Sequence, residues 1–155
     1  MNLTLLEAEL RRDEGVRYLP YLDTAVPPRR TIAVGHNMDV SPLPADWTFP
    51  LTDAQVNQLL ARDIASTISK LDGALPWWNQ MSDVRMRVLA NMCFNLGIGG
   101  LQTFKNTLLA MQRGSYSMAA AGMRNSRWYS QVGARAERLT QAMQTGVMPV
   151  YGGIA

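Results

Sequence analysis

The sequence predicts an α+β fold that is mostly helical, with a small β lobe, a long connecting helix and a helical C-terminal lobe. Three observations lead to this prediction. Apolar residues recur at helical spacing before residue 15 and again after residue 52. The stretch between them is rich in aromatic, β-branched and turn residues, and glycines divide the C-terminal half into short helical runs.

The first helix and the β lobe follow each other directly. Leu3, Leu6 and Leu10 mark one helical face, and Gly15 is suited to the position just beyond a helix C-terminus. We therefore expect the helix to end at about Glu14. The segments RYLPYLD and TIAVGH, separated by TAVPPRR, then predict short strands joined by a loop.

The long helix begins after an irregular connection, NMDVSPLPADWTFP, which carries three prolines. Thr52 and Gln55 have the spacing of a capping box. The apolar face of the helix is predicted to comprise Val56, Leu59, Leu60, Ile64, Ile68 and Leu71. From Ser82 onward, a further helical face follows, made of Val84, Val88, Leu89, Met92 and Leu96.

Charge and composition restrict the classes of partner. The net charge of +3 and the pI near 9.4 suit an anionic partner such as nucleic acid, a membrane surface or the bacterial cell wall. The arginines are scattered, which weighs against nucleic acid. No segment approaches the roughly 20 apolar residues of a membrane span, and the N-terminus lacks a signal-peptide pattern, so we expect cytoplasmic synthesis and no stable membrane insertion. The single cysteine, Cys93, excludes an internal disulfide and lies in an apolar pattern that predicts burial.

Two acidic residues have the arrangement that glycoside hydrolysis requires, namely a protonated acid and a second carboxylate. Glu14 is expected at a helix C-terminus, where the helix dipole disfavours its anion. Asp23 follows in a loop, and Thr31 begins the strand that returns past it. Residue chemistry alone leaves an alternative open, in which Glu14 pairs with Arg11 or Arg17 at the surface and Asp23 is an ordinary turn residue.

Two separated clusters of residues resemble the phage lysozymes of the T-even type, glycoside hydrolase family 24. The resemblance covers nearly the whole chain. The first cluster comprises Arg12-Asp13-Glu14-Gly15, Tyr21, Asp23-Thr24, Thr31-Ile32 and Gly35-His36. The second comprises Asp83-Val84-Arg85, Asn91-Met92, Phe94, Gly97, Phe104, Asn106, Ser126-Arg127-Trp128-Tyr129 and Arg135-Ala136.

The resemblance implies a lysozyme-like two-lobed fold and a muramidase that cleaves the β-1,4 bond between N-acetylmuramic acid and N-acetylglucosamine in peptidoglycan. It implies that Glu14 is the general acid and that Asp23 and Thr31 position the attacking water in an inverting reaction. Phe94 and Thr107 match positions that line the glycan cleft of the family. No metal or organic cofactor is implied.

The sequence departs from the T-even pattern at three places, one of which is a shorter connection after His36. The loop from Asp23 to Thr31 is two residues longer and contains Pro27-Pro28, which we expect to bulge into solvent with Arg29 and Arg30. Gly122 stands where the T-even enzymes carry a glycan-contacting asparagine. A longer loop that pushed Asp23 toward the sugar would instead favour a retaining mechanism, with carboxyl groups about 5 to 5.5 Å apart.

We expect a single lysozyme domain over residues 1–155, with an N-terminal lobe at about 14–60 and a helical lobe at about 72–155 that also includes the helix 1–13. The resemblance implies an ion pair between His36, the only histidine, and Asp63. It also implies that Trp128 packs in the core, and we expect Trp77 and Trp78 to close the end of the long helix.

Two other functions stay open. A lytic transglycosylase attacks the same polymer but forms an anhydro product without activated water, so it needs Glu14 and not Asp23. A non-catalytic module would bind the cell wall or nucleic acid through basic charge alone. We expect a monomer that acts on peptidoglycan in the periplasm or cell wall after release, as a free endolysin, a prophage product, or part of a virion or secretion system.

Overall fold

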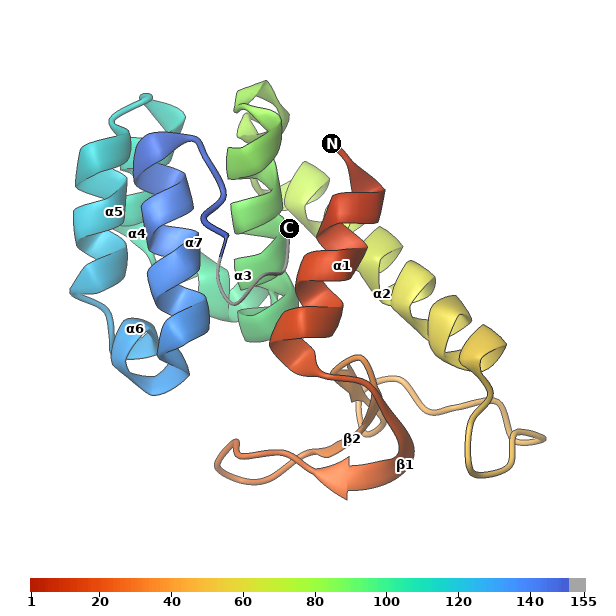
Figure 1. Ribbon diagram of the computed structural model, residues 1–155. Coiled ribbons are helices and arrows are strands. Elements are labelled where there is room, and N and C mark those ends of the chain that lie inside the picture. The colour runs from red at the N-terminus through yellow and green to blue at the C-terminus, as the bar shows by residue number, and fades with distance from the viewer. Residues whose placement is uncertain (151–155) are drawn as a thin grey trace. The chain divides into compact units, whose positions relative to one another are not determined.

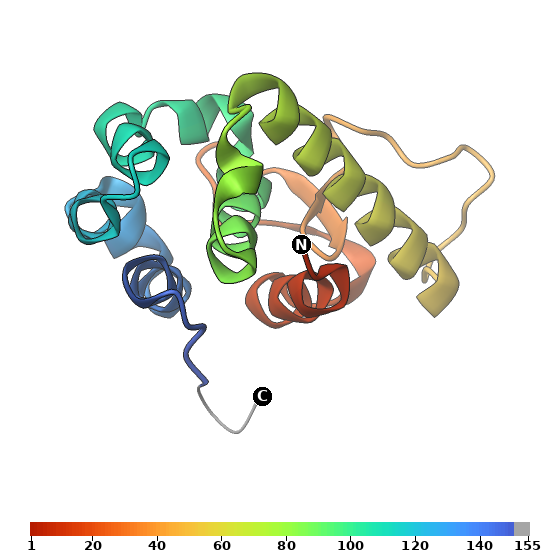
Figure 2. The same ribbon diagram turned by 90° about the horizontal axis from the view of Figure 1, so that it is seen from above.

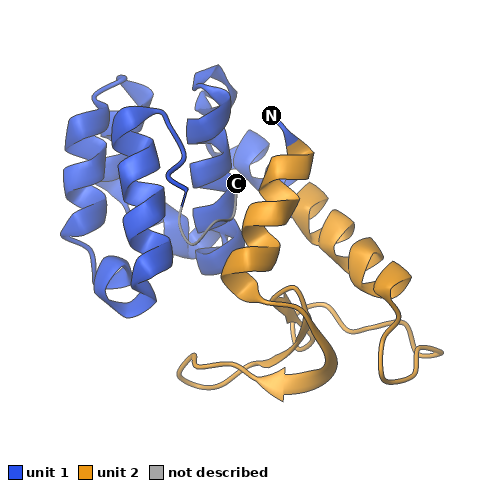
Figure 3. Cartoon of the chain, viewed as in Figure 1, with its two compact units in different colours: residues 1–2, 67–155 blue, residues 3–66 orange. Residues whose placement is uncertain are grey.

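The computed structural model describes residues 1–150, which form two compact units. Unit 2 is Leu3–Ser66, and unit 1 is Met1–Asn2 with Thr67–Ala155 (Figure 3). The boundary lies inside one long helix. This division differs from the expected lobes, which grouped residues 1–13 with the helical lobe. The first helix leads directly into the sheet, and Arg11 donates a hydrogen bond of 2.6 Å to Asn57 within the same unit.

Unit 2 begins with α1 (Leu3–Glu14), whose Leu6 and Leu10 are buried one turn apart. The helix ends as expected: the Gly15 amide donates to the Arg11 carbonyl, and Gly15 has a φ of +74°, which favours glycine. The chain then enters β1 (Arg17–Leu22) after two residues. Glu14 is therefore the last residue of α1. The passage from α1 into β1 can be followed in Figure 1.

A three-stranded antiparallel sheet in the order β1-β2-β3 confirms the predicted β region. It contains β1, β2 (Arg30–Ala33) and β3 (His36–Asn37). Tyr21 pairs with Thr31 across β1 and β2. A tight turn through Gly35 connects β2 to β3, and an irregular connection leads from β3 to the next helix, as the prolines predict.

Helix α2 (Asp53–Ala74) begins with the predicted capping box. The Thr52 amide donates to Gln55 Oε1 at 2.9 Å, and the Gln55 amide donates to Thr52 Oγ1 at 3.1 Å. Most of its predicted apolar face is buried, namely Val56, Leu59, Leu60, Ile64 and Leu71. The helix closes at η1 (Trp78–Gln80), where buried Trp78 donates its indole N–H to Asp72 at 2.7 Å.

Unit 1 continues with five α-helices among the described residues: α3 (Asp83–Gln102), α4 (Lys105–Gln112), α5 (Tyr116–Arg124), α6 (Arg127–Val132) and α7 (Ala134–Thr145). Ser82 caps α3 through a hydrogen bond from the Arg85 amide, and Gly97, with a φ of 73° and a ψ of 162°, interrupts it. Helix α5 packs against both α4 and α7, and the three are seen nearly end-on in Figure 2. The mostly helical α+β fold is thus confirmed. No helix within residues 1–150 has the length and apolar character to cross a membrane.

Candidate active site

Glu14 is held at the end of α1, with its carboxyl group against the β2–β3 turn. A Cβ added to Gly35 would lie 2.8 Å from both Cδ and Oε2 of Glu14. Such a contact is shorter than carbon atoms tolerate, and Gly35 also has a φ of +63°. Only glycine therefore lets the turn approach the carboxyl group this closely, and the turn fixes one side of Glu14.

Tyr21, on β1, connects the two acidic residues electrostatically. Burial raises the pKa of its phenol most, the negative charges of Glu14 and Asp23 raise it further, and Arg17 lowers it. The Arg17 guanidinium lies over the Tyr21 ring, 4.8 Å from its centroid. Glu14 and Asp23 thus act on the same side chain, and Thr31 is the strand partner of that side chain.

Asp23 directly follows β1, and its carboxylate is enclosed by its own loop. Oδ1 accepts hydrogen bonds from the amides of Ala25 at 3.1 Å and Arg29 at 2.9 Å, while Oδ2 accepts one from Arg29 Nε at 2.8 Å. Burial alone would raise the pKa of Asp23, but these hydrogen bonds and the Arg29 charge outweigh it and lower the pKa. Asp23 is therefore an anion at neutral pH.

The loop between β1 and β2 only partly matches the expectation of a solvent bulge. Val26, Pro27 and Pro28 are exposed, and Val26 retains 98% of its accessible surface. Arg29 does not extend into solvent in the expected way. Its amide and guanidinium both turn back to Asp23, because the loop is closed by the hydrogen bond from the Asp23 amide to the Arg29 carbonyl.

Thr31 lies on β2 with its side chain buried. Its hydroxyl donates a hydrogen bond of 3.0 Å to the carbonyl of Arg29. A hydroxyl that donates in this way still has lone pairs with which to accept a hydrogen bond from water. The two predicted water-positioning residues thus both contact Arg29.

The predicted pair of His36 and Asp63 is present. His36 Nδ1 lies 2.7 Å from Asp63 Oδ2, which joins β3 to α2 within unit 2. His36 Nε2 lies 2.7 Å from the carbonyl oxygen of Ser41. The pair fixes the strand that follows the Gly35 turn. Within residues 1–150, no three side chains of His, Cys, Asp or Glu gather as a metal site would require.

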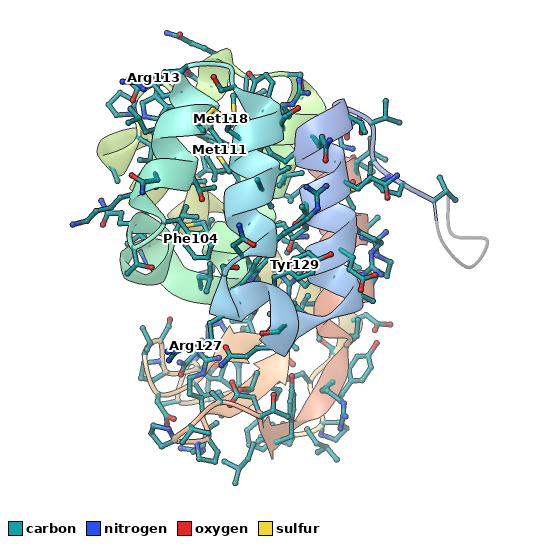
Figure 4. All side chains as sticks on the ribbon, turned by 90° about the vertical axis from the view of Figure 1, so that its left-hand side faces the viewer. Phe104, Met111, Arg113, Met118, Arg127 and Tyr129 are labelled. Carbon is teal, nitrogen blue, oxygen red and sulfur yellow. The ribbon has the colours of Figure 1, made fainter. Side chains whose placement is uncertain are left out.

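Unit 1 contains a hollow of about 710 Å³ between the end of α3 and the beginnings of α4 and α6. Predicted site residue Thr107 is on its lining, whereas predicted site residue Phe94 lies earlier on α3 and is not. Figure 4 shows Phe104 at the N-terminal end of α4 and Arg127 at the beginning of α6. The lining residues are Leu96, Gly100, Thr103, Phe104, Lys105, Asn106, Thr107, Gly122, Ser126, Arg127, Trp128 and Gln131.

Trp128 forms a buried wall of this hollow, which confirms its predicted core position. It is 4% exposed, donates its indole N–H to Asn95 Oδ1 at 2.9 Å, and meets the Phe104 ring edge-to-face at 6.2 Å. Ser126 caps α6 by accepting a hydrogen bond from the Tyr129 amide.

Three contributions to the candidate site were missed by the sequence analysis. Gly35 was not linked to Glu14, because a glycine in a hairpin is already explained by its φ. The sequence predicts Arg29 in a solvent-exposed insertion, whereas the loop geometry gives it contacts to Asp23 and Thr31. Lys105 and Arg127 line the hollow together, although 22 positions separate them in the sequence.

Comparisons with known proteins agree with this architecture. The phage lysozyme family profile matches residues 11–144. The chain is 30% identical to pre-baseplate central spike protein Gp5 of Enterobacteria phage T4, over 97% of this chain and 29% of that protein. It is 24% identical to probable T4-type lysozyme 2 of Dictyostelium discoideum, over 94% of this chain and 97% of that protein. It is also 40% identical to peptidoglycan hydrolase gp36 of Pseudomonas phage phiKMV, over 36% of this chain and 6% of that protein.

The mostly helical α+β architecture and the match to the phage lysozyme family define the class of the chain as a lysozyme. The sequence predicts the same class of enzyme. The chain belongs to the phage lysozyme family. It spans less than a third of the length of the T4 spike protein and nearly the whole length of the Dictyostelium relative.

Proposed function

We propose that the chain hydrolyses bacterial peptidoglycan at the β-1,4 bond between N-acetylmuramic acid and N-acetylglucosamine. The observation that carries the proposal is the placement of Glu14 at the end of α1, with its carboxyl group on the Gly35 turn and with its charge and that of Asp23 both acting on Tyr21. The name of the phiKMV relative, a peptidoglycan hydrolase, supports this substrate. The net charge of +3 suits an anionic wall polymer.

The proposed reaction is a single displacement. Protonated Glu14 donates its proton to the glycosidic oxygen as the bond from that oxygen to C1 breaks. A water molecule attacks C1 from the opposite face and transfers a proton to the carboxylate of Asp23, while Thr31 accepts a hydrogen bond from the water. The lowered pKa of Asp23 supports its role, since only the anion can accept this proton.

Glycan binding is assigned in the proposal to Phe94 and Thr107. Thr107 lies on a hollow that also presents Asn106 and Gln131, and these polar groups can pair with hydroxyl and acetamido groups. Lys105 and Arg127 add positive charge, which suits carboxylates of a cell-wall polymer. Support for Phe94 comes from its matching position in the family and not from the hollow.

The first test is to replace Glu14 with Gln, which keeps the shape but cannot deliver a proton. Wall hydrolysis should fall by about 10² to 10⁴, the usual contribution of general acid catalysis. Glu7→Gln, a change of the same kind on α1, is the matched control and should leave activity intact. Turbidity of bacterial walls measures the rate, and thermal melting confirms that both variants fold.

Mass spectrometry of digested peptidoglycan identifies the reaction catalysed by the wild type. Reducing ends are expected from a hydrolase, whereas anhydro ends would identify a lytic transglycosylase. Glu14→Gln with a tenth or more of wild-type activity would contradict the assignment of the general acid.

A further inference from the structure

Arg29 contacts both residues of the proposed water site through four hydrogen bonds. Its amide and its Nε donate to the two carboxylate oxygens of Asp23, at 2.9 and 2.8 Å. Its carbonyl accepts from the Asp23 amide and from Thr31 Oγ1, both at 3.0 Å. The loop from Asp23 to Arg29 is thus closed by one residue, which also orients the Thr31 hydroxyl.

We propose that Arg29 is a positioning residue, which sets the orientation of the Asp23 carboxylate and of the Thr31 hydroxyl for the water that attacks the glycan. This inference rests on the proposed function, because it requires Asp23 to act on that water.

The hydrogen-bond geometry gives the Arg29 guanidinium a specific part in orienting the Asp23 carboxylate. The Asp23 side chain is 19% exposed and the Arg29 side chain 49% exposed, so an ordinary ion pair between them would contribute little. Here the backbone of Arg29 fixes Oδ1 while its Nε fixes Oδ2, so both oxygens are constrained at once. Rotation of the carboxylate is therefore restricted: Oδ1 accepts two hydrogen bonds from the loop, one of them from the Ala25 amide, and Oδ2 accepts one.

Other titratable groups act on Tyr21, which the charge of Asp23 also affects. Tyr21 and Arg17 lie on β1, and Glu14 at the end of α1 acts on the same Tyr21 phenol. These groups stay unchanged when Arg29 is replaced. A change in the titration of Asp23 after that replacement therefore reports the guanidinium itself.

The experiment compares Arg29→Met with Arg30→Met and Arg29→Lys. Methionine keeps the length of the stem and removes the charge and the donor. Arg30 is the matched control, since it is the adjacent exposed arginine and, within residues 1–150, its hydrogen bonds to Asp39 and Met38 are made by its backbone. Rates on soluble peptidoglycan fragments are measured from pH 3 to pH 8, and the Asp23 carboxyl is titrated by ¹³C NMR.

For Arg29→Met we expect kcat to fall about tenfold with KM nearly unchanged. This loss of rate is larger than the negligible effect expected from removing an exposed ion pair. It is smaller than the roughly 100-fold loss expected when a reacting group is misplaced by 1 Å. The acid limb of kcat/KM and the NMR titration of Asp23 should both move to higher pH. Arg29→Lys should recover part of both effects, and Arg30→Met should behave as wild type.

Three results would overturn the proposal: an Asp23 titration unchanged in Arg29→Met, a loss of rate confined to KM, or an equal loss in Arg30→Met. A separate variant, Asp23→Asn, tests the proposed function itself. Full activity in Asp23→Asn would contradict the role of Asp23. An inactive Asp23→Asn together with an unaffected Arg29→Met would remove only the inference about Arg29.

Discussion

Both ring nitrogens of His36 lie at 2.7 Å from an oxygen atom. Its neighbours are the carboxylate of Asp63 at Nδ1 and the carbonyl of Ser41 at Nε2, and both of these groups are acceptors. The geometry therefore favours the imidazolium. Burial lowers the pKa of His36, but the hydrogen bond and charge of Asp63 and the Ser41 carbonyl outweigh burial and raise it.

This pair predicts a specific pH dependence of stability. A histidine whose folded pKa lies above its unfolded value of about 6.5 contributes fully below that pH, and the contribution is lost as pH rises through the folded pKa. The free energy of unfolding of the wild type should exceed that of Asp63→Asn by more at pH 5.5 than at pH 9. We expect this excess to change by about 1 to 3 kcal/mol between the two pH values. Urea unfolding of both proteins at a series of pH values measures this difference.

Few other groups interfere with that measurement. His36 is the only histidine in the chain, and burial raises the pKa of the Cys93 thiol to about 11. The α-amino group is common to both proteins and cancels in the comparison. A stability difference between wild type and Asp63→Asn that did not change with pH would contradict the protonated pair.

At the scale of residues, the sequence predicts the position of a side chain where that position depends on a local pattern. Glu14 could be placed because the leucine periodicity stops at Gly15. The hydrogen bonds of Asp23 could not be predicted, because they depend on how seven residues of an irregular loop fold back. The resemblance identified Asp23 as a site residue, but it provided no information on Arg29.

At the scale of elements, α4 and α5 approach closely at Gly122. A Cβ at this position would overlap Thr107 Oγ1 and lie 3.3 Å from Thr107 Cβ. We predict that Gly122→Ala destabilises the fold by about 1 to 3 kcal/mol, the usual cost of overpacking. Chemical denaturation measures the change.

Two further variants separate overpacking from the general effect of adding a methyl group to a helix. Gly99→Ala is the control, since nothing lies within 4 Å of its added Cβ, and it should be neutral or stabilising by up to about 1 kcal/mol. Thr107→Ala combined with Gly122→Ala should recover part of the lost stability, because the overlapping hydroxyl is gone. Equal effects of Gly99→Ala and Gly122→Ala would exclude close packing as the cause.

Helix ends were the most predictable elements. The capping box of α2 and the glycine end of α1 follow from short spacings, and the structure confirms them. The grouping of α1 in one unit with the β region and the first part of α2 was not predicted, because it depends on contacts between distant segments, such as that of Arg11 on α1 with Asn57 on α2. The departure at Gly122 was visible in the sequence, but its packing against Thr107 was not.

For the whole molecule, the class follows from the order of its elements and from family membership. A basic chain of 155 residues with two acidic groups near Tyr21 suits cleavage of an anionic wall polymer. A lytic transglycosylase would leave the anionic Asp23 and its hydrogen-bonded loop without a purpose. The proposed hydrolysis by activated water uses both Glu14 and Asp23.

The stereochemistry of the product tests this account most directly. If Asp23 and Thr31 hold a water on the face of the sugar opposite Glu14, a β-linked glycan gives the α-anomer first, because the reaction is one inversion. Proton NMR of the reducing ends during the first turnovers distinguishes the anomers before mutarotation mixes them. The account predicts the α-anomer, and a β-anomer formed first would contradict the activation of water by Asp23.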